Sequence, residues 1–130
     1  MKRSTVMELI VLDETLAIVR LPAEAPVPAW VAGRDFLAVV RTRRELSIVC
    51  RDDAVPATYT EVERGFRALA VVGTLDFMLT GIVASLSGPL AKAGISIFGI
   101  STYDTDHILV RAERLEDAKR ALEAAGHIVR

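Results

Sequence analysis

Hydrophobic positions follow two different periods along this chain, and the change falls near residue 62. Before that point, short runs of branched aliphatic residues alternate with polar or proline-rich stretches, a pattern typical of β-strands and turns. After it, strand-like runs alternate with segments whose apolar residues recur every three or four positions, the spacing of an amphipathic helix. The pattern predicts an α+β chain built from two successive units, residues 1–62 and 63–130.

The first half contains four strand-like runs. Asp13 and Glu14 separate the first two, and a short polar pair between aliphatic runs predicts a tight hairpin. The helical signal in this half is weak, so the unit is expected to be a reduced form of a larger pattern. The four predicted strands are residues 7–12, 15–20, 36–41 and 46–51.

Prolines and polar residues mark the breaks in the first half. Pro22, Pro26 and Pro28 exclude a long regular element from the segment that contains them, although a short helix at 28–33 is compatible with proline in its first turn. The stretch 52–64 is polar and contains a further proline, so it predicts a linker between the two units.

The second half has the order βαββαβ. Gly126 follows the strongest amphipathic segment and provides its C-terminal stop. Two helices and four strands in this order predict the ferredoxin-like arrangement, an antiparallel sheet with both helices on one face. Units of this size are marginal alone, so we expect the halves to share a core or a sheet. The predicted strands are 66–72, 95–102, 107–111 and 127–130, and the predicted helices 80–93 and 115–125.

The start of the first predicted helix carries no acid, base or nucleophile. Thr80 is the expected N-cap residue, and Gly81 leaves the backbone uncovered by a side chain. The first amide N–H groups of a helix have no internal partners, and with the helix dipole they suit a carboxylate. The alternative is a plain capped helix with glycine chosen for packing. Gly88 and Pro89 predict a kink or a restart further along this helix.

Residues 81–110 read GIVASLSGPLAKAGISIFGISTYDTDHILV. This segment resembles the ACT domain, the small-molecule-sensing module of amino-acid metabolism. It is most similar to compact bacterial tandem-ACT proteins, the ACT domains of aspartate kinases and the CASTOR-type arginine sensors. The resemblance covers residues 63–130, while residues 1–62 agree in general pattern. It implies two tandem ferredoxin-like units, an amino-acid ligand, a homodimer and no catalysis.

Three aspartates are candidates for contacting a ligand ammonium. In the CASTOR-type sensors the aspartate of a Thr-Asp-His stretch contacts the ligand, and the matching residue here is Asp106. Asp76 precedes the helix and ranks second, and Asp104 in the predicted 103–106 turn ranks third. The alternative for each is that an aspartate in a turn caps its own backbone.

The loop 73–81 joins a strand to the helix where ACT effectors usually sit. Phe77 and Leu79 stand where the arginine sensors carry polar residues, which favours a less polar ligand side chain than arginine; alternatively they pack under the loop. Ser101 and Thr102 end a strand and could reach the same cavity. The predicted ligand-binding residues are Asp76, Phe77, Leu79, Thr80, Gly81, Ile82, Ser101, Thr102 and Asp106.

Composition removes several other classes of function. With 16 Lys and Arg against 17 Asp and Glu, the chain is not a basic module, which argues against nucleic acid as a partner. Cys50 lies in an alternating run and predicts a buried strand residue. His107 adjoins Asp106, but neighbours on a strand point to opposite faces, so a catalytic pair is not expected. We expect no metal or other cofactor.

The sequence therefore predicts a non-catalytic regulatory protein that binds an amino acid. No apolar run approaches the roughly 20 residues of a membrane helix, and the first ten residues lack the features of a signal peptide, so a cytoplasmic protein is expected. Its expected partners are the amino acid, a second copy of the chain, and a regulated enzyme or other protein. The alternative is a constitutive interaction module that kept the fold and lost the pocket. A small enzyme is the third possibility.

Overall fold

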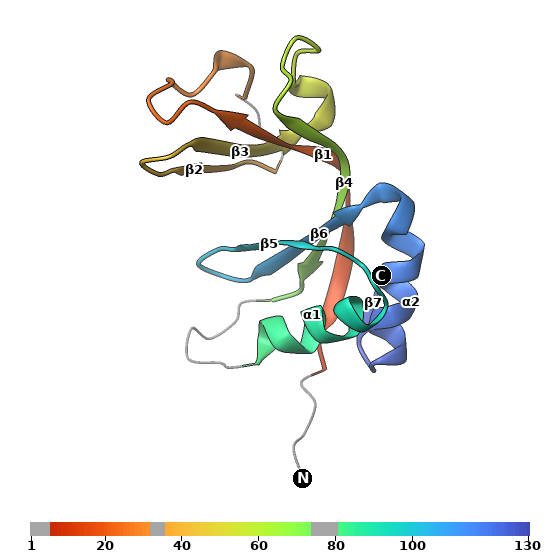
Figure 1. Ribbon diagram of the computed structural model, residues 1–130. Helices are drawn as coiled ribbons and strands as arrows, with labels where there is room; N and C mark the ends of the chain where they lie inside the picture. Colours follow the sequence, from red (N-terminus) through yellow and green to blue (C-terminus); the bar gives the residue numbers. More distant parts are fainter. Residues whose placement is uncertain (1–5, 32–35, 74–80) are drawn as a thin grey trace. The chain divides into compact units, whose positions relative to one another are not determined.

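A computed structural model describes residues 6–31, 36–73 and 81–130 (Figure 1). The contacts of the chain define two compact units. Unit 1 comprises Met1–Asp13 and Arg67–Arg130, and unit 2 comprises Glu14–Phe66. The elements are β1 (Glu8–Leu21), a 3₁₀ turn (Ala29–Val31), β2 (Ala38–Arg41), β3 (Leu46–Arg51), a 3₁₀ turn (Asp52–Ala54), β4 (Val62–Val71), α1 (Ile82–Lys92), β5 (Phe98–Ser101), β6 (Asp106–Arg111), a 3₁₀ turn (Ala112–Arg114), α2 (Leu115–Ala124) and β7 (Ile128–Val129).

The first strand is one continuous element, so the hairpin predicted at Asp13 and Glu14 is wrong. β1 runs through both residues without a turn. Hairpin turns of two residues need positive φ angles, which favour glycine or asparagine, and this acidic pair supplies neither. The strand instead contributes to two units: its first half pairs with β7, and its second half, from Leu16 to Leu21, pairs with β3.

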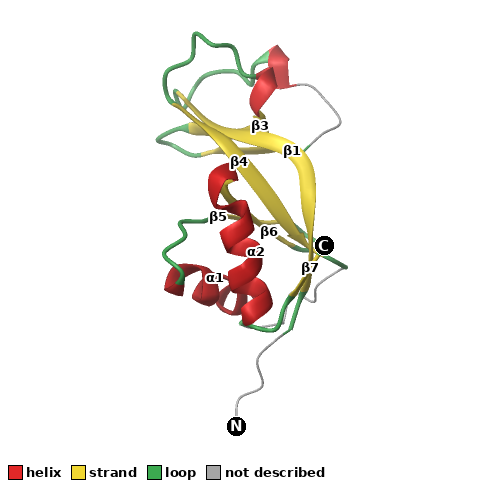
Figure 2. Cartoon of the chain, turned by 90° about the vertical axis from the view of Figure 1, so that its right-hand side faces the viewer, coloured by secondary structure: helices red, strands yellow, loops and turns green. Residues whose placement is uncertain are grey.

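Unit 1 is an α+β layer structure, as the sequence predicts. Its strands follow the order β7-β1-β4-β6-β5, in which β5 and β6 are antiparallel and β7 runs parallel to β1. Helices α1 and α2 contact each other and cover one face of the sheet (Figure 2). The start of β1 lies between β7 and β4, an insertion that the simple βαββαβ order does not contain.

Aliphatic side chains from the sheet and both helices form the core of unit 1. From α1 the spacing of four residues places Ile82, Leu86 and Leu90 on the buried face. α2 buries Ala118 and Leu122. Gly126 follows α2 with a φ angle of 98°, the left-handed geometry predicted for the C-terminal stop. The other buried members of this cluster are Leu9, Leu69, Val71, Ile95, Ile108 and Val110.

Unit 2 has a small core of its own and no α-helix among its described residues. The predicted short helix appears as the 3₁₀ turn Ala29–Val31. Trp30 packs edge-on against Tyr59 with ring centroids 5.2 Å apart, and its indole Nε1 donates to the Tyr59 hydroxyl at 3.2 Å. Both rings pack against the buried cluster Ala17, Val19, Leu46, Ile48, Cys50 and Val55.

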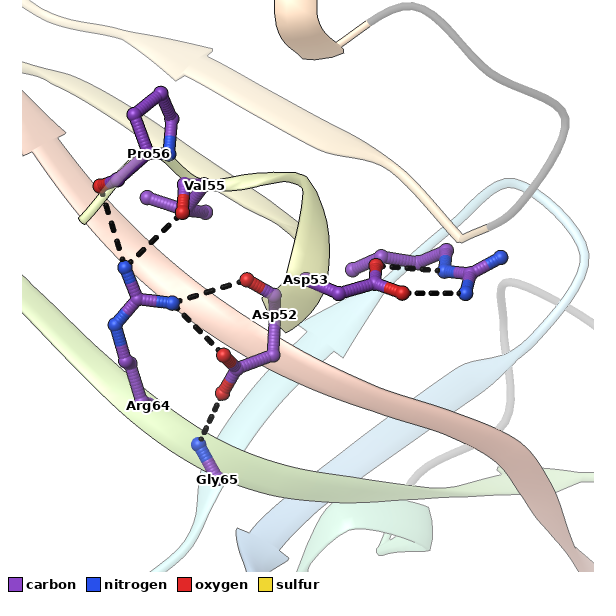
Figure 3. A network of polar contacts seen from close by, with 7 residues as sticks. Asp52, Asp53, Val55, Pro56, Arg64 and Gly65 are labelled. Atoms are coloured by element: carbon purple, nitrogen blue, oxygen red, sulfur yellow. Dashed lines mark hydrogen bonds and ion pairs between the residues drawn. The ribbon is translucent and has the colours of Figure 1, made fainter.

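Residues 52–64, predicted as a linker, form an anchored part of unit 2. The Asp52 carboxylate accepts hydrogen bonds from Arg64 Nη1 and from the Gly65 amide, both at 2.8 Å (Figure 3). Arg64 Nη2 donates to the carbonyls of Val55 and Pro56 at 3.1 and 3.3 Å. These bonds fix the loop to β4, which begins at Val62.

The units also differ from the division predicted at residue 62. The boundary between compact units falls at Phe66 and Arg67, and the residues up to Asp13 are grouped with the C-terminal part of the chain. The physical reason is that β1 is one long strand. Its first half pairs with β7, which lies more than 100 residues later in the sequence.

Cys50 is buried in β3, with 3% of its surface exposed. Burial is the main reason that the pKa of its thiol is raised; the Asp52 carboxylate adds to this, and the Arg64 guanidinium opposes it. The thiolate is the reactive species, so native Cys50 is expected to resist a disulfide reagent at neutral pH and to react fully after denaturation. Fast stoichiometric labelling of the folded protein would contradict this expectation.

Candidate functional site

The candidate site is built around the first turn of α1. Gly81 occupies the N-cap position with a φ angle of 78°, a left-handed conformation that strains other residues. The sequence predicts Thr80 as the cap, but the helix boundary puts Gly81 there, and no side chain among the described residues caps the turn with a hydrogen bond. A Cβ added to Gly81 would have no neighbour among the described atoms within 4 Å. As far as the described atoms are concerned, the backbone at this point is therefore open to approach.

The amides of this turn are donors without helical partners. The Ser85 amide makes the first intrahelical bond, to the Gly81 carbonyl at 2.9 Å, so the amides of residues 82–84 precede the ladder. The first turn contains no acidic residue, and Lys92 lies in the last turn. The positive end of the helix dipole is therefore not neutralised within its own turn. Such a turn can accept an anionic group.

Not every predicted residue can be placed. Asp76, Phe77, Leu79 and Thr80 lie outside the described residues. Ile82 directs its side chain into the core and is 7% exposed, so it offers the site its backbone amide.

The turn between β5 and β6 brings the other predicted residues together. The Ser101 hydroxyl donates to Asp106 Oδ1 at 2.6 Å. The Thr102 hydroxyl donates to the Thr105 carbonyl at 3.0 Å and accepts from the Thr105 amide at 3.2 Å. Ser101 and Thr102 are exposed, and Asp106 is half-buried. A turn lies between β5 and β6 as predicted, and Asp104 is exposed within it, but Asp106, predicted as part of the turn, is the first residue of β6.

Thr105 is a residue of this region that sequence reasoning did not select. Its hydroxyl donates to the Val71 carbonyl at 2.9 Å and so ties the β5–β6 turn to the end of β4. β4 is the strand that leads toward residues 73–81. Two threonines within the five residues from Ser101 to Thr105 were the available signal, because hydroxyls at a turn commonly bond to nearby backbone.

His107 follows Asp106 on β6 and lies opposite Ile100 on β5. Burial is the main cause of a lowered pKa for this imidazole; a hydrogen bond with the Ile100 backbone and the Asp106 charge act in the other direction.

This pKa direction gives a pH dependence. The unfolded chain binds the His107 proton near pH 6.5 and the folded chain only at lower pH, so acidification through this window favours unfolding. We expect the stability of the native protein to fall more between pH 7 and 5 than that of His107→Gln, measured by chemical denaturation. Both proteins keep His127, so the comparison isolates His107. The same dependence of stability on pH in the two proteins would contradict this expectation.

The described residues offer neither a metal-binding cluster nor a helix that could span a membrane. Within the ranges 6–31, 36–73 and 81–130, no group of three or more His, Cys, Asp or Glu side chains is placed to hold a metal ion. Across the same described ranges, none of the helices has both the length and the apolar character needed to span a bilayer.

Comparison with known families agrees with this architecture. The family model described as an ACT domain matches residues 61–124, and a second model, described as an N-terminal domain, matches residues 14–58. No curated protein matches the chain significantly. Among solved structures, the Agrobacterium tumefaciens protein Atu0741 is 40% identical, with a TM-score of 0.91 over 97% of this chain and 93% of that one. The chain belongs to the ACT-domain family.

More distant structures share the fold. The regulatory subunit of aspartate kinase from Thermus flavus is 16% identical, with a TM-score of 0.63 over 92% of this chain and 97% of that one. Aspartate kinase from Clostridium acetobutylicum is 14% identical, with a TM-score of 0.70 over 95% of this chain and 36% of that enzyme. The present ACT-domain chain thus shares its fold with these two aspartate kinase structures.

Proposed function

We propose that this protein binds a free amino acid and acts as a non-catalytic regulator, with the ligand carboxylate held by the backbone amides at the start of α1. The observation that carries the proposal is the first turn of α1: it follows a left-handed glycine, contains no acid and has no side-chain cap from the part of the chain that the structure describes. Backbone donors and a helix dipole bind a carboxylate without a basic side chain. A cytoplasmic location stays a prediction.

A sensor must hold its ligand without changing it. The exposed part of the proposed site offers hydroxyls and backbone groups, with Asp106 as its acid among the described residues. Asp106 Oδ1 accepts the Ser101 hydroxyl, and the second oxygen of this half-buried carboxylate is a candidate partner for the ligand ammonium. In this proposal Asp76, Phe77, Leu79 and Thr80 complete the site from the preceding loop.

Asp106→Asn is expected to weaken amino-acid binding between about tenfold and a hundredfold, because a hydrogen bond to a charged group is worth roughly 1.5–3 kcal/mol. Asparagine keeps an acceptor for the Ser101 hydroxyl but removes the charge that the ammonium needs. Ser101→Ala is the comparison variant: it removes the other side of the Ser101–Asp106 bond and keeps the carboxylate, so it measures what the hydroxyl alone contributes to binding. Calorimetric titration would separate the two, and unchanged affinity in Asp106→Asn would mean that Asp106 serves only the bond with Ser101 at the start of β6.

The same proposal includes a homodimer, which the surface of α1 supports. Its outward residues are small or apolar and uncharged before Lys92: Val83 is 54% exposed, and Ala84, Gly88 and Ala91 are exposed as well. On α2, by contrast, Glu116, Arg120 and Glu123 face solvent. Because charge is depleted at the centre of protein interfaces, α1 is the better candidate for contact with a second copy or a regulated enzyme.

The second candidate function is a constitutive interaction module. The uncharged outward face of α1 favours it, because that face needs no ligand to bind a partner.

A thermal-shift panel of the common amino acids separates the two functions. A ligand at 100 times its Kd stabilises the fold by about 2.7 kcal/mol, which is several degrees for a chain of this size. The sensor proposal expects such a shift with at least one amino acid. The absence of a shift with all of them would favour the interaction module.

A further inference from the structure

Pro89 leaves one backbone acceptor of α1 without its usual donor. In an α-helix the amide of each residue donates to the carbonyl four residues earlier, and proline has no amide hydrogen. The acceptor that Pro89 cannot serve is the Ser85 carbonyl. The helix nevertheless continues through Pro89 to Lys92 as one element, so it is not interrupted where a kink or a restart is predicted. A carbonyl in this position needs a hydrogen-bond donor from outside the helix.

The imidazole of His127 lies where that donor is needed. Its Nε2 is 2.8 Å from the Ser85 carbonyl oxygen, and its Nδ1 is 3.0 Å from the Met7 amide nitrogen. A backbone amide can only donate, so Nδ1 is the acceptor. A neutral imidazole with an unprotonated Nδ1 carries its hydrogen on Nε2. The ring therefore donates from Nε2 to the Ser85 carbonyl.

The backbone around His127 fixes the position of this ring. The His127 amide donates to the Leu122 carbonyl at 3.0 Å, in the turn that closes α2, and the next amide, of Ile128, donates to the Met7 carbonyl at 3.0 Å. His127 is 5% exposed and is the one polar residue classed as buried in the part of the chain that the structure describes. A buried polar ring with both nitrogens satisfied joins α1, α2 and β1.

We infer that His127 is a positioning residue: its imidazole supplies the hydrogen-bond donor that Pro89 lacks, and thereby couples α1 to Met7, the residue before β1, and to the turn that closes α2. Pro89 and His127 act as a pair in this arrangement. The imidazole replaces an amide of the helix, and the replacement links that helix to a residue 42 positions away in the sequence. The consequence for ligand affinity rests on the proposed function, whereas the pairing itself does not.

A double-mutant cycle tests the pairing. In a Pro89→Ala background the new amide can donate to the Ser85 carbonyl, so the histidine is no longer needed there. We expect His127→Ala to lower the folding equilibrium constant about tenfold in the native chain, because it leaves buried groups without partners, and about threefold or less beside Pro89→Ala. Equal losses in the two backgrounds would overturn the inference.

Two milder variants keep the test available if His127→Ala does not fold. The Gln side-chain amide reaches the position of Nε2 and keeps a donor for the Ser85 carbonyl, whereas the shorter Asn amide reaches the position of Nδ1 and keeps an acceptor for Met7. His127→Gln should be the more stable variant in the native chain, and its advantage should vanish beside Pro89→Ala. An advantage of equal size in both backgrounds would count against the pairing.

Nitrogen-15 NMR of the ring gives a readout that packing alone does not move. The inference requires a protonated Nε2 and an unprotonated Nδ1 in the folded protein, and the opposite tautomer would refute it. If the thermal-shift panel identifies an amino acid, His127→Gln should bind it more tightly than His127→Asn. A panel without any hit would remove the proposed function, while the cycle and the tautomer would still decide the role of His127.

Discussion

Gly81→Ala is expected to weaken amino-acid binding between about tenfold and a hundredfold, the loss of a charge-assisted hydrogen bond worth roughly 1.5–3 kcal/mol. The added methyl group has no protein neighbour within 4 Å among the described atoms, so it would project into the space through which a carboxylate reaches the first amides of α1. The φ angle of 78° also strains alanine, at a stability cost of about 1–2 kcal/mol.

Gly94→Ala is the matched control for this experiment. Gly94 follows the other end of α1 with a φ angle of 74°, and a Cβ there also has no neighbour within 4 Å. The two substitutions should therefore cost similar stability, while only the one at Gly81 should affect binding. Calorimetric titration with the amino acid that gives the largest thermal shift makes the comparison. Equal affinities of the two variants would place the ligand elsewhere.

Asp52→Ala is expected to destabilise the protein by about 2 kcal/mol, the range for hydrogen bonds to a charged group. The substitution removes the acceptor of both Arg64 Nη1 and the Gly65 amide, which hold the loop to β4 (Figure 3). The Asp52 side chain is 23% exposed, so the lost bonds are partly shielded from water. For a chain of this length the midpoint of thermal unfolding should fall by roughly 5–10 °C.

The neighbouring aspartate provides the control. Asp53 accepts two hydrogen bonds from Arg51, at 3.1 and 2.7 Å, but its side chain is 70% exposed. Exposed ion pairs contribute about 0–1 kcal/mol, so Asp53→Ala should change the midpoint little. Similar losses in the two variants would show that the Asp52 bonds hold the loop no better than a surface ion pair does.

Local signals predicted the elements of unit 1 well. α2 follows from an apolar stripe through Leu115, Ala118 and Leu122 and from the left-handed glycine after it. The burial of Cys50 follows from its place in an alternating strand. In each case the information lies within a few residues, which is the range over which periodicity and turn chemistry act.

Long-range pairing is what the sequence pattern missed. The acidic pair at Asp13 and Glu14 suggests a turn locally, but β1 stays extended because its two halves pair with strands of different units. The loop after β3 has the composition of a linker, yet the Asp52 carboxylate fixes it through Arg64, 12 residues away. No local pattern encodes these partners.

The candidate site was predictable in its chemistry and less so in its details. Glycine at a helix start without an acid predicts a backbone anion site, and the structure adds that Gly81 is the N-cap residue and has a left-handed conformation. The bond of Asp106 with Ser101 and the role of His127 depend on which side chains meet in space. Those contacts could not be derived from spacing alone.

A titration of nitrogen-15-labelled protein with single amino acids, followed by the amide signals of Ile82, Val83 and Ala84, tests the central claim most directly. Binding of a carboxylate to these donors should move their signals strongly and in proportion to occupancy, while the signals of unit 2 change little. The account would be contradicted if the signals of residues 82–84 stayed in place with every amino acid. It would also be contradicted if they stayed in place while signals of other residues responded.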